Sequence, residues 1–267
     1  MDNQLLLICL LTAVINLIGA LAYAARIAGV RTGRIAMSFA LFNLLVLVSR
    51  MSNSFLGPFL AKRIELRIAS GGGDALAGDF RLVLASASVA VFVGILLVPT
   101  AQRLFAQAIG WFQHNRSTAR LVLRTASPAG LSAIRHSLTM PSPRNLKQLG
   151  KPKDIGWGVL VANMLAQGLI TVGVLASLYA GYLNPEFRVT ASQLSAVING
   201  VATILLFAFI DPQISVMTDD VVEGRMDANA FRRAIIWISL SRLAGTVAAQ
   251  VFFIPSAMAV AWVANYV

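Results

Sequence analysis

The sequence predicts an all-α, polytopic membrane protein with about six transmembrane helices and with both termini outside. Its 267 residues are 57% hydrophobic and only 12% charged, whereas a soluble domain is roughly a quarter charged. The apolar residues also gather into six runs, each about as long as the roughly 20 helical residues that cross a bilayer core. These two observations exclude an ordinary soluble globular protein, and they predict a single transmembrane domain that occupies the whole chain.

The first three runs lie in the N-terminal half. They extend from about Leu5 to Ala25, from Ile35 to Leu56 and from Leu82 to Ala101. The first could be mistaken for a signal peptide, because Ala20-Leu21-Ala22 has the pattern of a cleavage site. No basic residue precedes it, however, and Asp2 is the only early charge. An uncleaved first span is therefore expected.

The second run becomes polar along its length. Asn43, Ser49, Arg50, Ser52, Asn53 and Ser54 all fall in its second part. Helical spacing places Asn43, Arg50 and Ser54 on one face, with Asn53 beside them. Such a face suits the lining of a hydrophilic cavity. The alternative is that Arg50 lies near the outer end and extends to the head groups, while the amides and hydroxyls bond neighbouring helices.

The last three runs extend from about Trp157 to Tyr182, from Ala191 to Ile210 and from Ala234 to Pro255. Arg242 lies about two turns into the last span, where a buried charge needs a partner or a cavity. Asp211, at the inner end of the fifth span, is a candidate partner. Alternatively, Asp211 caps a short helix that begins at Pro212 and continues past Asp219 and Asp220.

The positions of the basic residues predict the orientation. With the N-terminus outside, 15 of the 22 Lys and Arg residues fall in inside loops and two lie within spans. The remaining five, expected in outside loops, are Lys62, Arg63, Arg67, Arg81 and Arg188. This excess on the inside is typical of cytoplasmic loops. Three spans in each half would give the halves opposite topology, as in inverted-repeat transporters. A short sequence repeat, which chance explains equally well, matches Phe80-Arg81 and Gly94 with Phe231-Arg232 and Gly245.

A basic loop from about Arg103 to Asp154 separates the two halves. Arg116, Arg120 and Arg124 recur every four residues, which predicts a helix on the membrane surface that contacts anionic lipids. The charge of +11 is confined to a few stretches, so nucleic acid is not an expected partner. A single cysteine and two histidines predict no disulfide framework, metal site or cofactor.

Three arginines follow the first span. Arg26, Arg31 and Arg34 flank Gly29 and Gly33 at the depth of the cytoplasmic head groups. Guanidinium groups bind phosphate oxygens in pairs, and glycines let backbone amides approach the same anion. The turn could therefore bind the diphosphate of a lipid. The alternative is that these arginines only fix the orientation of the span.

Three segments carry a resemblance to a known family. They are YAARIAGVRTGRIA (residues 23–36), FNLLVLVSRMSN (residues 42–53) with the following Pro58-Phe59, and FAFIDPQISVMTDD (residues 207–220). These segments resemble the Amj family, the alternate lipid II flippases of bacteria. The resemblance implies a multi-pass protein of the bacterial cytoplasmic membrane that moves an undecaprenyl-diphosphate-linked peptidoglycan precursor, lipid II, from the inner to the outer leaflet. It brings no set of functional residues.

The physical argument supplies a site hypothesis for that implied role. Arg26, Arg31 and Arg34 would capture the diphosphate inside, and Arg50 and Arg242 would stabilise it in transit. Asp211, with Asp219 or Asp220, would pair with arginine when the anion is absent, and Asn43, Asn53 and Ser54 would line the cavity. Stripes of small residues (Ser86, Ala90 and Gly94, or Gly158, Ala162 and Ala166) could support a homodimer. Two alternatives are a scaffold for the wall-synthesis machinery and a polyprenyl-diphosphate phosphatase.

Overall fold

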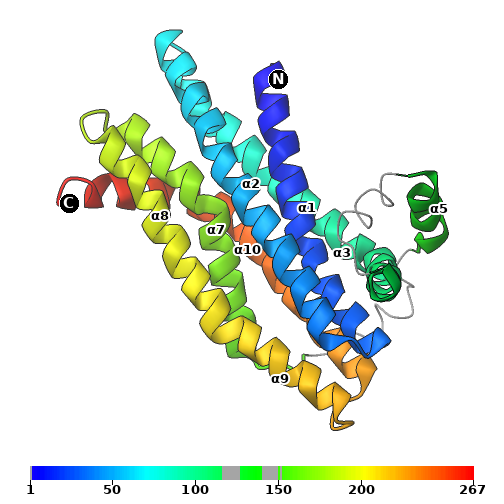
Figure 1. Ribbon diagram of the computed structural model, residues 1–267. Coiled ribbons are helices and arrows are strands. Elements are labelled where there is room, and N and C mark those ends of the chain that lie inside the picture. The colour runs from blue at the N-terminus through cyan, green and yellow to red at the C-terminus, as the bar shows by residue number, and fades with distance from the viewer. Residues whose placement is uncertain (1, 116–126, 140–149, 151) are drawn as a thin grey trace.

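The computed structural model describes residues 2–115, 127–139, 150 and 152–267 (Figure 1). Six helices in these ranges are long and apolar enough to cross a membrane, which confirms the predicted all-α polytopic fold class. The predicted surface helix around Arg116, Arg120 and Arg124 lies outside the described residues.

The helices fall into two groups along the chain. The first half contains α1 (Asn3–Thr32), α2 (Ile35–Ala69), the short η1 (Gly73–Ala75) and α3 (Leu76–Asn115), and α5 (Pro128–Ser137) follows it. The second half contains α7 (Trp157–Leu183), α8 (Arg188–Leu205), η2 (Leu206–Ile210), α9 (Asp211–Val222) and α10 (Ala228–Val263). The η2 segment is a π-helix that joins α8 and α9, and together they make one of the six candidate spans.

Several helices extend well beyond the apolar runs. α2 continues to Ala69 and α3 begins at Leu76, so Lys62, Arg63, Arg67 and Arg81 are helical rather than part of a loop, as the sequence had suggested. Arg188 is likewise the first residue of α8. The hydrogen bonds of a helix do not require a hydrocarbon environment. The helices therefore continue beyond the apolar runs, and their additional turns carry charged residues.

The two halves of the chain share one packing pattern. α1 packs against both α2 and α3, α7 packs against both α8 and α10, and α3 contacts α10 between the halves. The residues of the short sequence repeat have matching positions in the two halves. Phe80 and Phe231 are both fully buried. Gly94 of α3 lies against Ala20 of α1, and Gly245 of α10 lies against Met164 of α7. The two halves are thus alike in which of their helices pack together and in where these two glycines make contact.

The stripes of small residues are used largely within the chain. Ala90 is buried, and a methyl group on Gly94 would come within 2.6 Å of the Ala20 side chain. Ala166 is fully buried in the core that α7 shares with α10 and α1. These positions are therefore occupied by intramolecular packing and are not available to a second copy.

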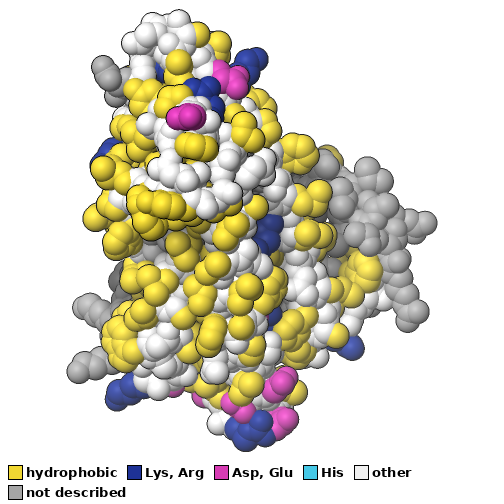
Figure 2. All heavy atoms as spheres, turned by 90° about the vertical axis from the view of Figure 1, so that its left-hand side faces the viewer, with side chains coloured by type: hydrophobic (Ala, Val, Ile, Leu, Met, Phe, Trp, Pro, Cys, Tyr) yellow, Lys and Arg dark blue, Asp and Glu magenta, His cyan; other side chains and the backbone are white. Residues whose placement is uncertain are grey.

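The outer surface is suited to lipid. Leu44, Leu47, Val201, Ile204 and Val251 are large hydrophobic residues that are exposed on the long helices. Figure 2 shows one face on which hydrophobic side chains cover the middle and most of the charged ones gather at the two ends. The buried residues of α2 form one stripe, which contains Ser38, Phe42, Ser49, Leu56, Leu60, Arg63 and Ile64. One face of α2 thus packs inward while the others face the bilayer.

A network of ion pairs, which we name the terminal network, joins α1, α2 and α3 at the end of the bundle that carries both termini. The Arg63 side chain is only 3% exposed. It donates to the Asp79 carboxylate at 2.8 Å and to Asp2 at 2.6 Å, and Arg67 also pairs with Asp79 at 3.1 Å. The hydrogen bonds from Arg63 and from the Leu5 backbone lower the pKa of Asp2. Asp2 is therefore ionised at neutral pH, and each buried charge of the terminal network has a partner.

We expect Asp79→Asn to lower the free energy of unfolding by about 3 kcal/mol, because it removes one of the carboxylates that compensate the buried Arg63 guanidinium. Denaturant titration of the purified protein in detergent measures this loss. Glu65→Gln is the matched control, since Glu65 is an exposed carboxylate on α2 and its change should stay within about 0.5 kcal/mol. Equal stability of the two variants would contradict a structural role for the terminal network.

Candidate functional site

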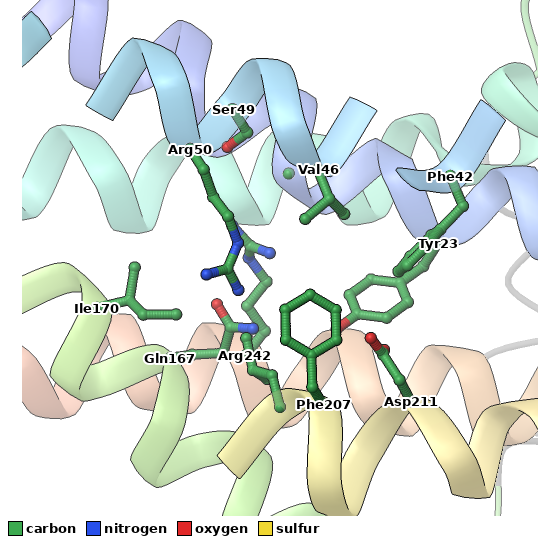
Figure 3. Close-up of a pocket in the computed structure, with 12 residues that line it drawn as sticks. Tyr23, Phe42, Val46, Ser49, Arg50, Gln167, Ile170, Phe207, Asp211 and Arg242 are labelled. Atoms are coloured by element: carbon green, nitrogen blue, oxygen red, sulfur yellow. The ribbon is translucent and has the colours of Figure 1, made fainter. Parts of the chain in front are cut away.

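Two adjoining cavities lie between the halves of the chain, each with a volume of about 60 Å³. They share Ser49, Arg50, Ile170 and Arg242 in their walls. The first cavity is completed by Gly19, Tyr23, Phe42, Val46, Gln167, Leu206, Phe207 and Asp211 (Figure 3). The second continues past Thr12, Asn16, Asn53 and Thr171. We name the two together the central site.

Arg50 enters the central site from α2. Because α2 has 35 residues and continues to Ala69, Arg50 lies near the middle of the helix and not near its outer end, as one of the two sequence interpretations required. Its Nη1 atom donates a hydrogen bond to Thr203 Oγ1 at 2.5 Å. Its guanidinium carbon also lies 5.4 Å from the centre of the Phe207 ring. Both contacts reach across from α2 to the α8–α9 helix of the other half.

Arg242 enters the central site from α10. It lies 14 residues after the start of that helix, which is roughly 20 Å at the rise of an α-helix. Its Nε atom is buried and has no hydrogen-bond partner among the described residues. Gly19 makes room for the guanidinium, because a Cβ atom at that position would lie 2.5 Å from Arg242 Nη2. An alanine at this position would therefore displace the guanidinium end of the Arg242 side chain.

Asp211 also lines the central site, and it does so from within a helix. Its backbone angles, φ −63° and ψ −40°, are helical, whereas a helix N-cap has an extended conformation. The interpretation of Asp211 as an N-cap is therefore wrong. The chain passes through the π-helix instead, and Pro212, which has no N–H to donate, follows this wider turn. The Asp211 carboxylate points toward Tyr23 (Figure 3).

Asp211 and the arginines share the central site without forming a close ion pair. None of the ion pairs between described residues involves Asp211, Arg50 or Arg242. The two guanidinium groups therefore repel each other in a confined space, and a single carboxylate offsets them only in part. The central site carries an excess of positive charge and can accept an anion.

Arg26, Arg31 and Arg34 do not form one cluster. Arg26 is 2% exposed, and its guanidinium carbon lies 3.6 Å from the centre of the Phe39 ring and 4.3 Å from that of Phe42. Its Nε and Nη1 atoms have no hydrogen-bond partner among the described residues. Arg31 and Arg34 are exposed near the turn at Gly33, where φ is +67°. Cation–π stacking thus holds Arg26 in the core, away from the other two.

The other predicted polar residues are distributed unevenly. Asn53 lines the second cavity, whereas Asn43 and Ser54 are exposed on α2 and line neither. Asp219 is exposed as well. Asp220 pairs with Arg225 at 2.7 Å near the end of α9. Of the predicted carboxylates, only Asp211 lies in the central site.

Two amides of α7 were not singled out in the sequence, and one of them lines the central site. Gln167 lines the first cavity. The fully buried Asn163 donates to Ile238 O at 2.9 Å and to Ser241 Oγ at 2.7 Å, which fixes α7 against α10 one residue before Arg242. The sequence does contain a sign of this contact, because two amides lie four residues apart in an otherwise apolar span. Amides buried in a membrane need hydrogen-bond partners on neighbouring helices.

The described residues contain no group of three or more His, Cys, Asp or Glu side chains that could hold a metal ion. What the site offers is two guanidinium groups, one carboxylate, amides and aromatic rings near the middle of the bundle. A volume of about 60 Å³ admits only a few water molecules. The site can therefore stabilise an anionic group at mid-depth, and it is closed to a bulky ligand in this conformation.

Comparison with known proteins identifies a family and a relative of this chain. Residues 11–264 match the family model Amj, described as Alternate to MurJ. The chain is 37% identical to the lipid II flippase Amj of Bacillus subtilis (strain 168) over 268 aligned positions, covering 99% of this chain and 98% of the relative. No solved structure matches.

The contact between α7 and α10 positions Gln167 and Arg242, and it depends on Gly245. A Cβ atom there would collide with the Met164 carbonyl oxygen and lie 3.0 Å from Gly168 N. We expect Gly245→Ala to lower the free energy of unfolding by about 2 kcal/mol, the cost of overpacking a contact between backbones. The control is Gly78→Ala, where a Cβ atom meets nothing within 4 Å. An equally small effect of both changes in detergent unfolding would contradict the close approach.

Proposed function

This chain belongs to the Amj family, and from that premise we propose how its arginines serve transport. The protein is a lipid II flippase, a multi-pass protein of the bacterial cytoplasmic membrane that moves the lipid-linked precursor of peptidoglycan between the leaflets. A flippase changes the position of its substrate and not its covalent structure, so the function is transport and not catalysis.

We propose that Arg50 and Arg242 stabilise the diphosphate of lipid II during the crossing. An anion in the hydrocarbon region is costly unless fixed positive groups replace its hydration. The two guanidinium groups come from different halves of the chain and enter one cavity near the middle of the bundle. Guanidinium donates hydrogen bonds to phosphate in pairs. The observation that supports the proposal most directly is this pair of arginines without a carboxylate in ion-pair contact.

Asp211 serves in this proposal as the resting counter-ion. It is the carboxylate that lines the same cavity as both arginines, and its helix is interrupted by the π-helix just before it. π-Helical segments inside α-helices are frequently found at functional sites. When the diphosphate enters, its charge replaces that of Asp211 as the partner of the arginines, so binding exchanges one counter-ion for another. Asp219 and Asp220 line neither cavity, and we assign them no part in this exchange.

The closed central site implies that the halves must move apart. A cavity of about 60 Å³ cannot admit the large head group of lipid II. The cavity lies where α1 and α2 face α7, α9 and α10, so separation of the two halves would open it. From the excess of basic residues in the predicted inside loops, we propose that both termini are outside. The turn at Gly33 and the segment α5 then lie on the cytoplasmic side, where lipid II enters.

Two further partners remain proposals. The exposed Arg34 would contact anionic lipids of the cytoplasmic leaflet, as basic residues at that depth generally do. A homodimer would give a bulky head group a larger enclosure than six helices alone. Its interface would have to use surface that intramolecular packing leaves free, since Ala90, Gly94 and Ala166 are packed inside one chain.

Arg50→Gln and Arg242→Gln should each abolish support of growth in cells that lack every other lipid II flippase. Each change removes one of the two charges that we assign to the diphosphate, which costs about 1.5–3 kcal/mol per charged hydrogen bond. A leaflet-specific assay of lipid II in those cells should find the precursor retained inside.

The matched control for this experiment is Arg232→Gln, because Arg232 lies on the same helix as Arg242 and lines neither cavity. Membrane insertion of all three variants is measured in parallel. Full support of growth by both cavity variants, with normal insertion, would refute the transit role of these arginines.

Gly19→Ala should slow the appearance of lipid II in the outer leaflet by about tenfold, because the new methyl group displaces the Arg242 guanidinium and weakens about one charged hydrogen bond to the anion. Gly200→Ala is the control, since a Cβ atom there meets nothing within 4 Å. A wild-type rate for Gly19→Ala would contradict the requirement for Arg242 in its observed position.

A further inference from the structure

A third cavity, separate from the central site, lies at the end of the bundle opposite the termini. Its volume is about 410 Å³, and it is lined by Arg31, Arg103, Ala106, Gln107, His136 and Ser137. These residues come from the last turn of α1, from the second half of α3 and from the end of α5. We name it the basic vestibule.

The wall between α3 and α5 is built by specific hydrogen bonds. Thr100 Oγ1 accepts from the Thr139 backbone N–H at 3.0 Å and donates to the Thr139 carbonyl at 3.1 Å. Near this contact, Gln107 Nε2 donates to Ser137 Oγ at 3.4 Å. Thr100, Arg103 and Gln107 are spaced by three and four residues, so they share the face of α3 that meets α5. This wall of the vestibule is thus held by packed elements.

The charges of the basic vestibule are not compensated within the described chain. Arg31 and Arg103 take part in none of the ion pairs between described residues, and no carboxylate is among the described residues that line the cavity. Two guanidinium groups, an imidazole, an amide and a hydroxyl supply hydrogen-bond donors. Because arginine matches the geometry of phosphate oxygens, this donor set favours a phosphate or diphosphate anion. The volume of about 410 Å³ far exceeds the 60 Å³ of either central cavity, so a phosphate group can enter.

We propose that the basic vestibule binds the diphosphate of a lipid before it enters the central site. This inference rests on the proposed function and adds Arg103 and His136 to the residues that meet the substrate. The position along α1 supports it. Arg31 follows Arg26 by five residues, and Arg26 follows Gly19 by seven, which is roughly 8 Å and 10 Å of helix. The vestibule, the buried Arg26 and the central site therefore lie in sequence along one helix.

Binding to the full chain in lipid nanodiscs tests the proposal. Three probes are titrated: undecaprenyl diphosphate in the nanodisc, inorganic diphosphate in solution, and phosphatidylglycerol in place of the diphosphate lipid. Arg103→Gln and Arg31→Gln are each expected to weaken binding of the diphosphate lipid about tenfold, the effect of losing one charged hydrogen bond. Lys153→Gln is the matched control, because it removes a positive charge from an exposed position that lines no described cavity.

The probes distinguish the source of the anion. If the vestibule variants lose binding of undecaprenyl diphosphate but keep binding of inorganic diphosphate, the vestibule is a site that loads the lipid. If they lose binding of both probes, the vestibule recognises the diphosphate anion directly. Equal binding by Arg103→Gln and the wild type overturns the proposal. Equally tight binding of phosphatidylglycerol also overturns it, because the vestibule would then be a general contact for anionic lipid. Unfolding in detergent should be unchanged in these variants, since both arginines are exposed.

The result is separable from that of the proposed function. If Arg50→Gln retains undecaprenyl diphosphate binding but loses transport, while Arg103→Gln loses binding, loading and transit are two steps. If Arg103→Gln binds normally and Arg50→Gln still blocks transport, the vestibule proposal fails and the proposed function stands.

Discussion

The cost of placing a guanidinium group inside a bilayer is the constraint on which the rest of this structure depends. Insertion scales put that cost at about 3 kcal/mol for each arginine, and the protein has Arg26, Arg50 and Arg242 within its long helices. Each is removed from lipid in a different way. Arg26 stacks on two phenylalanine rings, Arg50 bonds Thr203 across the interface between the halves, and Arg242 occupies space left by Gly19.

The charged groups at different depths differ in how far they are neutralised. In the terminal network, Arg63 and Arg67 meet Asp79 and Asp2 at hydrogen-bonding distance, so the positive charge is compensated and the helices are held together. In the central site, two arginines face one carboxylate without an ion pair, and in the basic vestibule two arginines face none. Compensated charge stabilises the fold, whereas the uncompensated charge supports our proposal that an anionic substrate binds at these two places.

The sequence predicted the six helices well, because membrane crossing requires long apolar runs whatever their packing. It also found Arg50, Arg242 and Asp211, since charge in such a run is costly and conspicuous. It failed where the outcome depended on neighbours. The second apolar run predicts a span that ends at Leu56, yet α2 continues through Arg63, whose charge is compensated by Asp79 of α3. A cap was one of the two interpretations of Asp211, because the π-helix that carries the chain into this residue leaves no sequence pattern. Gln167 was not predicted as a site residue, because an uncharged amide in an apolar span is a weaker sign of a cavity than a charged group.

The sequence by itself therefore determined the class of the protein, the number of its spans, its family resemblance and the arginines that need an explanation. All of these follow from local composition and spacing. Only the tertiary structure decided which arginines share a cavity, that Arg26 is separated from Arg31 and Arg34, and that Arg31 instead joins Arg103 and His136. The physical reason is that these groupings depend on how the helices pack against one another, at glycine contacts such as Gly19 with Arg242 and Gly245 with Met164. Spacing along one helix does not encode those distances between helices.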